Sequence, residues 1–478
     1  MPRPTRVPAT LRTPPDGRVP GVRALAPPSQ QPAAREQGTN LLFFALLLLL
    51  FLEFTGFSNT IPLLKVTRFT TILAWLLFAG TLLHFGPRRL LDSRQGALLA
   101  AFLVFTAVSV LFAYVQTPAF QAFRAHLDYL GLFLATACLL DRPSRIRKLG
   151  AVLGLTVLVL IVRNLDRLTS LSREGGFQAA YFLGDGNDFA WGLNVLLPFI
   201  LFLALERHRL GTRLFGVIGV LLAISGIVAT QSRGAALALG AEMLFFWVVV
   251  ARRKMLGAIV VASLAIGVVW FAPPEYSARL QTISDYREDS SSMARLQVWG
   301  ASLKMALDHP FGVGAGNFSA AYGRFYRPGA EDSMIAWAQG RWLSAHSVYF
   351  RVLGEYGFIG LLMILAILFA NVRQNFRTRA AIRAAGGVDG VPESLPGIIN
   401  MSLVGYAVAG TFLGGLTYPY LYILSGLTVG TARRVAVAES VSAAATAPAP
   451  PSAGRRQPTP WAMPVARRPR PAAAASNR

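Results

Sequence analysis

Residues 41–57 read LLFFALLLLLFLEFTGF, an apolar run whose single ionisable residue is Glu53. A mostly apolar run of about 17–25 residues is long enough to cross a bilayer as a helix. The run follows a polar segment, residues 1–38, whereas the apolar part of a signal peptide begins much nearer its start. The sequence therefore predicts a first membrane span that is retained, and an integral membrane protein.

The composition of the whole chain agrees with this prediction. Of its 478 residues, 54% are hydrophobic and 14% are charged, whereas a soluble domain carries roughly a quarter charged residues. The apolar residues form many separate blocks that are apolar on all sides, as membrane helices are, rather than on one face. The predicted fold class is an all-α, polytopic helix bundle.

About twelve blocks qualify as spans. They lie near residues 41–57, 69–86, 96–115, 126–140, 149–162, 188–205, 214–231, 234–251, 255–272 and 348–370, with two shorter spans in 397–432 separated by a break at Thr417–Tyr420.

The formal net charge of +23 raises the question of nucleic-acid binding. Its distribution argues against that function, because much of it lies in the two Arg/Pro-rich tails and in short loops. The loops 87–95, 141–148, 206–213, 251–254 and 372–396 alternate along the chain and hold 17 Lys and Arg among 54 residues. This is the pattern of cytoplasmic loops, because Lys and Arg resist translocation. Both tails are then predicted to be cytoplasmic, and no nucleic-acid partner is expected.

The predicted organisation has three parts. Residues 1–38 and 433–478 are expected to be disordered tails, and residues 39–432 to form the membrane domain. Within that domain, residues 273–345 form a large loop on the outer side. In this loop, residues 292–309 place apolar side chains at helical spacing and end at Pro310, which predicts a surface helix.

Arg233 and His346 lie at the predicted outer boundary of the membrane. Arg233 sits in a tight turn between two spans, where it could bind a phosphate or simply extend toward the lipid headgroups. His346 marks the end of the large loop, where a neutral imidazole could accept a proton from a hydroxyl group or merely face the interface. Arg295, on the predicted surface helix, is a further candidate, although such an arginine usually faces water or headgroups. Arg341 lies five residues before His346.

Other kinds of chemistry find little support. Cys138 is the only cysteine, so neither an intrachain disulfide nor a zinc cluster is expected. The glycine-rich run 310–318 lacks the preceding strand and the Lys-Ser/Thr of a phosphate-binding loop, so it is predicted to be a tight turn. No metal and no cofactor are predicted.

Together these motifs resemble the O-antigen ligase family. The pattern consists of Arg233-x3-Leu237, the arginine-bearing helix, the glycine-rich run and His346-Ser347-x9-Gly357-x-x-Gly360. It is accompanied by the stretch DGNDFA at residues 185–190, and the resemblance covers roughly residues 180–371. Within the family, the chain looks most similar to ligases found beside exosortase-type exopolysaccharide systems.

The resemblance implies a function. Family members transfer a glycan from undecaprenyl diphosphate to an acceptor hydroxyl on the periplasmic face of the inner membrane. The acceptor would be lipid A-core, another glycan or a protein.

The resemblance also implies roles for particular residues. His346 would be the general base, and Arg233, Arg295 and Arg341 would bind the diphosphate. Candidate contacts with donor or acceptor are Asp188, Tyr349 and Glu355. A departing diphosphate gains negative charge, which positioned cations stabilise.

Three alternatives stay open at this point. An O-antigen or exopolysaccharide polymerase uses the same donor and differs in its acceptor. A small-anion transporter would need ionisable residues near the bilayer midplane. A non-catalytic scaffold of an export complex is the third.

Overall fold

The computed structural model describes residues 33–446, except 171–176, 181–182, 206–209, 272–289, 328–342 and 389. The described residues form helices and connecting turns, without a β-strand. Each of the predicted apolar blocks forms helix. The helices are α1 (Ala33–Thr55), α4 (Phe69–Phe85), α6 (Arg94–Phe112), α7 (Gln116–Leu139), α8 (Pro143–Arg163), α10 (Gly186–Ala204), α11 (Leu210–Ala229), α12 (Arg233–Phe245) continued by the π-helical turn η2 (Phe246–Val250), α13 (Lys254–Phe271), α18 (Val348–Ala384), α19 (Leu395–Ala409) and α20 (Tyr420–Thr446). The all-α prediction is confirmed for this part of the chain.

Shorter helices connect these elements. They are α2 (Phe57–Thr60), α3 (Pro62–Val66), α5 (Arg88–Leu91), α9 (Leu165–Ser170), α16 (Phe318–Ala321) and the π-helical turn η3 (Tyr322–Tyr326).

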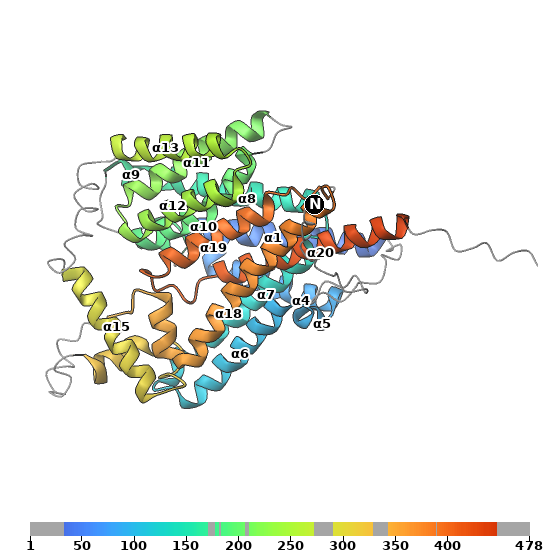
Figure 1. The fold of residues 1–478 in the computed structure, drawn as a ribbon. Coiled ribbons are helices and arrows are strands. Elements are labelled where there is room, and N and C mark those ends of the chain that lie inside the picture. The colour runs from blue at the N-terminus through green and yellow to red at the C-terminus, as the bar shows by residue number, and fades with distance from the viewer. Residues whose placement is uncertain are drawn as a thin grey trace, which may run out of the picture.

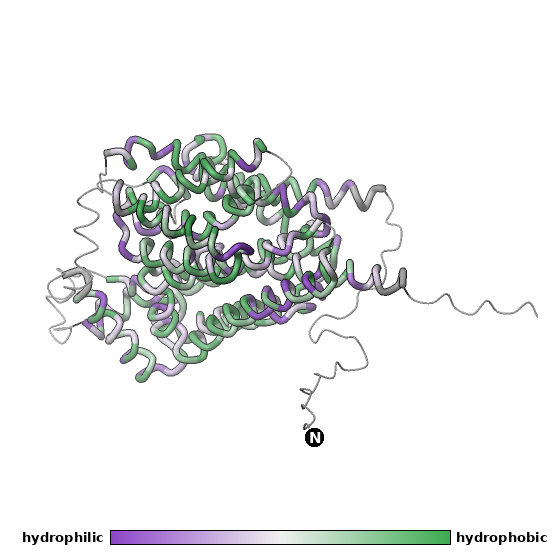
Figure 2. Tube along the Cα trace, turned by 45° about the horizontal axis from the view of Figure 1, so that its top comes forward, coloured by the Kyte–Doolittle hydropathy of each residue, from purple (hydrophilic) through white to green (hydrophobic). Residues whose placement is uncertain are grey.

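By length and apolarity, six of the described helices qualify as membrane spans. They are α1 from Gln37, α6, α10, α11, α12 with η2, and α18. Others are shorter, such as α4 and α19, or are less apolar, such as α7, which contains Arg124 and Asp128, and α8, which carries four basic residues. The count of about twelve spans therefore stays a prediction. Figure 2 shows hydrophobic residues along most of the helices.

Helix α10 is the most deeply buried of the six candidate spans. It packs against α8, α11 and α19, and 78% of its apolar window is buried, against 33% for α6. Its Trp191 is fully buried and stacks on Tyr406 of α19, with ring centroids 5.3 Å apart. The inner helices are thus held by side-chain packing, while the outer ones expose apolar surface.

Several of the basic loops meet at one end of the bundle. Arg252, before α13, forms an ion pair of 2.8 Å with Glu393, before α19. A Cβ atom on Gly390 would lie 2.2 Å from Pro143, at the start of α8. Three of the loops predicted to be cytoplasmic therefore share one end, which agrees with the predicted alternation.

Both predicted tail boundaries differ from the structure. Helix α1 begins at Ala33, before residue 39, and α20 continues to Thr446, past residue 432. Just past the second boundary, Arg433 donates hydrogen bonds to the carbonyls of Arg89 and Ala137 and so fixes this part of α20 to its neighbours. Residues 1–32 and 447–478 lie outside the described part of the chain.

The large loop contains the predicted helix, here α15 (Ser290–Asp308), which begins two residues earlier than expected and stops before Pro310. It packs against α18 (Figure 1). The glycine-rich run that follows forms the predicted tight turn, in which Gly312, Gly314 and Gly316 have positive φ. Whether α15 lies on a membrane surface stays a prediction.

Candidate active site at the His346 turn

His346 lies in a tight turn directly before α18. Its φ of +43° is in the left-handed region, which costs a non-glycine residue roughly 1–2 kcal/mol. The buried neighbours Ala345 and Ser347 hold the turn, and Ser347 caps α18 by accepting a hydrogen bond from the Phe350 amide (3.4 Å). The Val348 amide donates to the Gly410 carbonyl at 2.8 Å. This anchored backbone presents His346 at an exposed position.

Helix α15 docks on this turn through Trp299. The indole Nε1 donates to the Ala345 carbonyl at 2.9 Å, and the indole stacks on Phe350 with centroids 4.7 Å apart. Arg295 is one helical turn before Trp299 and therefore lies on the same face of α15. The structure thus brings Arg295 and His346 to one place.

The surroundings of His346 shift its pKa. Although His346 is exposed at its turn, neighbouring atoms displace part of its hydration, which lowers its pKa from 6.5, and the positive charge of Arg295 lowers the pKa further. The carboxylate of Asp185, the N-cap residue of α10, opposes these effects by raising the pKa. A lowered pKa favours the neutral imidazole near pH 7, which is the form that accepts a proton.

Arg233 is the first residue of α12. The turn before it has Gln231 at a φ of +54°, and the Ser232 side chain caps the helix by accepting from the Ala235 amide. A Cβ atom on Gly234 would lie 3.0 Å from Phe412, and the Phe412 ring lies 6.5 Å from the Trp299 ring. The start of α12 and the arginine-bearing helix therefore pack on the same aromatic residue.

The segment between α19 and α20 packs against the His346 turn. Besides the contacts of Gly410 and Phe412, a Cβ atom on Gly414 would lie 3.5 Å from the Cα of His346. Arg351 of α18 donates to the Gly414 carbonyl at 2.9 Å. The sequence indicated this segment only as a break between two spans. Its glycines were the available signal, since they permit close approach of the backbone.

The other predicted site residues that the structure describes bond to other parts of the protein. Asp188 accepts a hydrogen bond from the Tyr418 hydroxyl (2.9 Å), and the Tyr349 hydroxyl donates to the Ala407 carbonyl (2.9 Å). Glu355 is 1% exposed and pairs with Arg351 at 2.9 Å. Arg341 lies outside the described residues.

Glu355 and Gly357 both hold the glycine-rich turn against α18. The Glu355 carboxylate accepts from the Gly316 amide at 2.9 Å, which fastens the glycine-rich turn to α18. Next to it, Gly357 breaks the helix with a φ of +65°, and a Cβ atom there would lie 1.9 Å from the Pro310 carbonyl oxygen. These contacts position the turn after α15, so Glu355 has internal partners.

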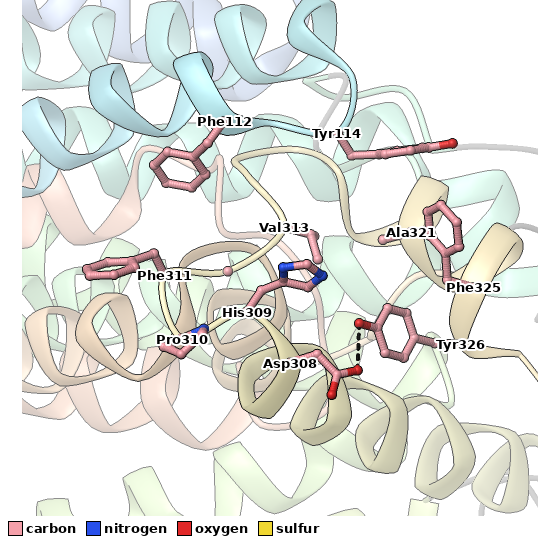
Figure 3. Close-up of a pocket in the computed structure, with 11 residues that line it drawn as sticks. Phe112, Tyr114, Asp308, His309, Pro310, Phe311, Val313, Ala321, Phe325 and Tyr326 are labelled. Carbon is pink, nitrogen blue, oxygen red and sulfur yellow. Dashed lines mark hydrogen bonds between the residues drawn. The ribbon is translucent and has the colours of Figure 1, made fainter.

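An aromatic pocket of about 800 Å³ lies beyond the other end of α15 (Figure 3). The aromatic pocket is lined by Phe112, Tyr114, Asp308, His309, Pro310, Phe311, Gly312, Val313, Ala321, Phe325 and Tyr326. The Tyr326 hydroxyl donates to Asp308 at 2.9 Å, and the rings of Tyr114 and Phe325 meet edge to face at 5.1 Å. Burial, together with the hydrogen bond to Asp308, raises the pKa of Tyr326 to about 12. The sequence pattern did not indicate this pocket.

Within the described residues, no group of three or more His, Cys, Asp or Glu side chains is placed to hold a metal ion. Two carboxylates, Asp185 and Asp188, lie at the start of α10.

Comparison with known proteins agrees with the resemblance seen in the motifs. No curated protein matches the chain. Residues 218–365 match the family model described as O-Antigen ligase, and this stretch contains Arg233, Arg295 and His346. This match, over less than half of the chain, supports membership of the O-antigen ligase family, and the six described helices that are long and apolar enough to cross a bilayer fit a membrane protein.

Proposed function

We propose that the protein transfers a glycan from undecaprenyl diphosphate to an acceptor hydroxyl at the outer face of the bacterial inner membrane. The observation that carries this proposal is the docking of the Arg295 helix on the His346 turn, beside the start of α12. This docking brings the candidate base, His346, close to Arg295 and Arg233, the candidate ligands of the diphosphate. Family membership supports glycan transfer in general terms.

The proposed reaction uses His346 as the base. Its neutral imidazole takes the proton of the acceptor hydroxyl as the hydroxyl oxygen attacks the anomeric carbon of the donor sugar. The bond between that carbon and the diphosphate oxygen breaks, and the electron pair leaves with the diphosphate. The imidazolium then returns its proton to the solvent or to the leaving group.

Arg233 and Arg295 are proposed to bind the diphosphate. A guanidinium group can form two parallel hydrogen bonds with phosphate oxygens. Arg233 also begins α12, where the positive end of the helix dipole favours an anion. Charge that grows on the leaving group in the transition state is thus stabilised more than the ground state. Asp188, Tyr349 and Arg341 stay secondary candidates for substrate contacts.

The aromatic pocket is proposed to hold sugar units distant from the reacting bond. Asp308 lies thirteen residues after Arg295 on α15, which corresponds to about 20 Å along a helix. A sugar has an apolar face that packs on a ring and hydroxyl groups that need polar partners. The exposed rings of Phe311 and Phe325 and the polar pair Asp308–Tyr326 offer both kinds of contact.

The proposed orientation places both ends of the chain in the cytoplasm and the His346 turn in the periplasm. It rests on the basic loops, which meet at the end of the bundle that bears Glu393. The segments before Ala33 and beyond Thr446 would then lie on the cytoplasmic side.

Reconstitution tests the proposed activity directly. The purified protein in proteoliposomes, given a lipid-linked glycan and an acceptor, is expected to form one capped product per acceptor, detected by mass spectrometry. Successive addition of repeat units would instead identify a polymerase, which the family match does not favour. Uptake of a labelled anion without transfer would identify a transporter.

The charge of Asp185 leads to a prediction about pH. Its carboxylate stabilises protonated His346, so Asp185→Asn is expected to lower the pKa of His346 further. More imidazole is then neutral at a given acidic pH, and the acid limb of kcat/KM should move to lower pH. Asparagine can still cap α10, so folding should be preserved. The matched control, Asp166→Asn on α9, should leave the pH profile unchanged, and an acid limb that moves upward would contradict the assignment.

Loss of Phe311 and Phe325, the two most exposed rings of its lining, tests the aromatic pocket. The double substitution Phe311→Ala/Phe325→Ala should raise KM for a glycan of several sugars by roughly tenfold, since each ring contact contributes about 0.5–1.5 kcal/mol. KM for a substrate with a single sugar should change little, because it does not reach the pocket. Phe120→Ala removes an exposed ring of α7 outside the pocket and is the control. An equal effect on short and long substrates would exclude the proposed role.

A further inference from the structure

A second pocket lies at the opposite end of the bundle, among the basic loops. This arginine pocket, of about 140 Å³, is enclosed by the start of α6, the second half of α18 and α20. It is lined by Asp92, Ser93, Arg94, Gln95, Ala370, Arg373, Gln374, Arg377, Val429, Ala432 and Arg433. Gln95 fixes its walls by donating to the Ala370 carbonyl at 3.1 Å.

The arginine pocket carries an excess of positive charge. Its lining contains four arginines and one acid, Asp92, so its formal charge is 4 − 1 = +3. That acid forms an ion pair of 3.6 Å with Arg89, outside the lining. Arg373 and Arg377 lie one helical turn apart, where like charges repel and destabilise a helix. A bound anion would remove this repulsion.

The hydrogen bonds of Arg433 do not neutralise its positive charge. Its guanidinium donates to the carbonyl oxygens of Arg89 and Ala137, which are neutral acceptors. The same bonds hold the guanidinium in position at the wall of the pocket. Concave surfaces lined by one sign of charge concentrate the electrostatic potential and so attract counter-ions.

Exposed apolar side chains lead away from the arginine pocket along α18. Leu362, Leu365 and Phe369 are 65%, 44% and 65% exposed. Their spacing of three and four residues puts them on one face of the helix, and the next position on that face is Arg373. The face is therefore apolar along its length and cationic at the pocket.

Helix α6, which packs beside α18, has the same arrangement. Val104, Val108 and Leu111 are 62%, 47% and 80% exposed. They continue a face that begins at Arg94, at the pocket. Two adjacent helices thus combine a cationic end with an exposed apolar face.

We propose that the arginine pocket binds the phosphate of an anionic phospholipid, whose acyl chains lie along these faces of α6 and α18. Arginine binds phosphate through paired hydrogen bonds, and basic pockets between membrane helices suit anionic headgroups. A free phosphate ion satisfies the same charges but makes no use of the apolar faces. The site is independent of glycan transfer and lies at the other end of the bundle from His346.

The experiment uses the full-length protein purified in a neutral detergent. Its thermal stability is measured during titration with phosphatidylglycerol, with phosphatidylcholine and with inorganic phosphate. Native mass spectrometry counts the lipids that remain bound. The test variant is Arg373→Gln/Arg377→Gln. The matched control, Arg147→Gln/Arg253→Gln, removes the same charge from exposed positions at the same end, outside the pocket.

Phosphatidylglycerol is expected to stabilise the unmodified protein and the control variant at low concentration, and phosphatidylcholine is not. The test variant should bind phosphatidylglycerol roughly 25-fold more weakly, about fivefold for each arginine. If phosphatidylglycerol binding weakened equally in both variants, the proposed site would be wrong, because losing two positive charges anywhere at this end would then weaken binding. Equal stabilisation by phosphatidylcholine would overturn the requirement for an anion. Stabilisation by inorganic phosphate at concentrations as low as those of phosphatidylglycerol would overturn the lipid assignment.

Discussion

Glycan transfer is expected to fall by about 10²–10⁴-fold when His346 is replaced by alanine, the range typical of a lost general base. The imidazole is the candidate proton acceptor on the docked turn, and its lowered pKa keeps it neutral near pH 7. The measurement is the initial rate of transfer in proteoliposomes, together with the amount of lipid-linked glycan that accumulates in cells. His84→Ala, at the end of α4, removes a histidine away from the proposed site and should leave the rate unchanged.

The backbone at His346 requires a second variant. Alanine is disfavoured at its φ of +43°, so a loss of activity in His346→Ala could reflect a displaced turn. Asparagine accepts left-handed backbone readily but is not a base at neutral pH. His346→Asn should therefore melt at the temperature of the unmodified protein and transfer glycan as slowly as the alanine variant. Normal transfer by His346→Asn would exclude the imidazole from the chemistry.

Replacing Arg295 by glutamine is expected to lower kcat by about 10²–10³-fold, the usual loss when one group that stabilises transition-state charge is removed. Glutamine preserves the length of the side chain and its tendency to form helix, so the docking of Trp299 on Ala345 should persist. The rate of transfer at saturating donor is the measurement. Lys304→Gln removes an exposed cation from the same helix and is the matched control.

A second measurement on Arg295→Gln separates a local charge from a structural role. The charge of Arg295 lowers the pKa of His346, so its removal should raise that pKa and move the acid limb of kcat/KM to higher pH. Asp185→Asn should move the limb in the opposite direction. A purely structural defect would lower the rate without moving the limb, and that outcome would refute the placement of Arg295 beside the base.

Much of the fold could be predicted because the helices are long and apolar. The blocks that begin near residues 41, 188 and 214 need no partner to be recognised, since hydrophobicity over some twenty residues is a local property. Helix α15 could also be predicted, because Leu296, Trp299 and Leu303 repeat at helical spacing and Pro310 stops the helix. Its boundaries differed by only one or two residues.

The assembly of the site could not be predicted in this way. The approach of Phe412 to Gly234 and of Gly414 to His346 joins segments far apart in the sequence. Nothing in the local pattern of residues 410–416 indicates which turn will pack on them. The same holds for Gly357, which combines a positive φ with the close approach of Pro310. The aromatic pocket was missed because its rings come from three separate elements.

The segment between α19 and α20 limits how far the chain can be shortened. The stretch that matches the family ends at residue 365, yet the His346 turn and Arg351 bond to the backbone of Gly410 and Gly414. A fragment restricted to residues 218–365 would lose these anchors and, with them, the support of the strained histidine backbone. Transplanting this family region into a chimera therefore requires the recipient to supply a matching glycine-rich loop, or α19 and α20 must be carried along with it.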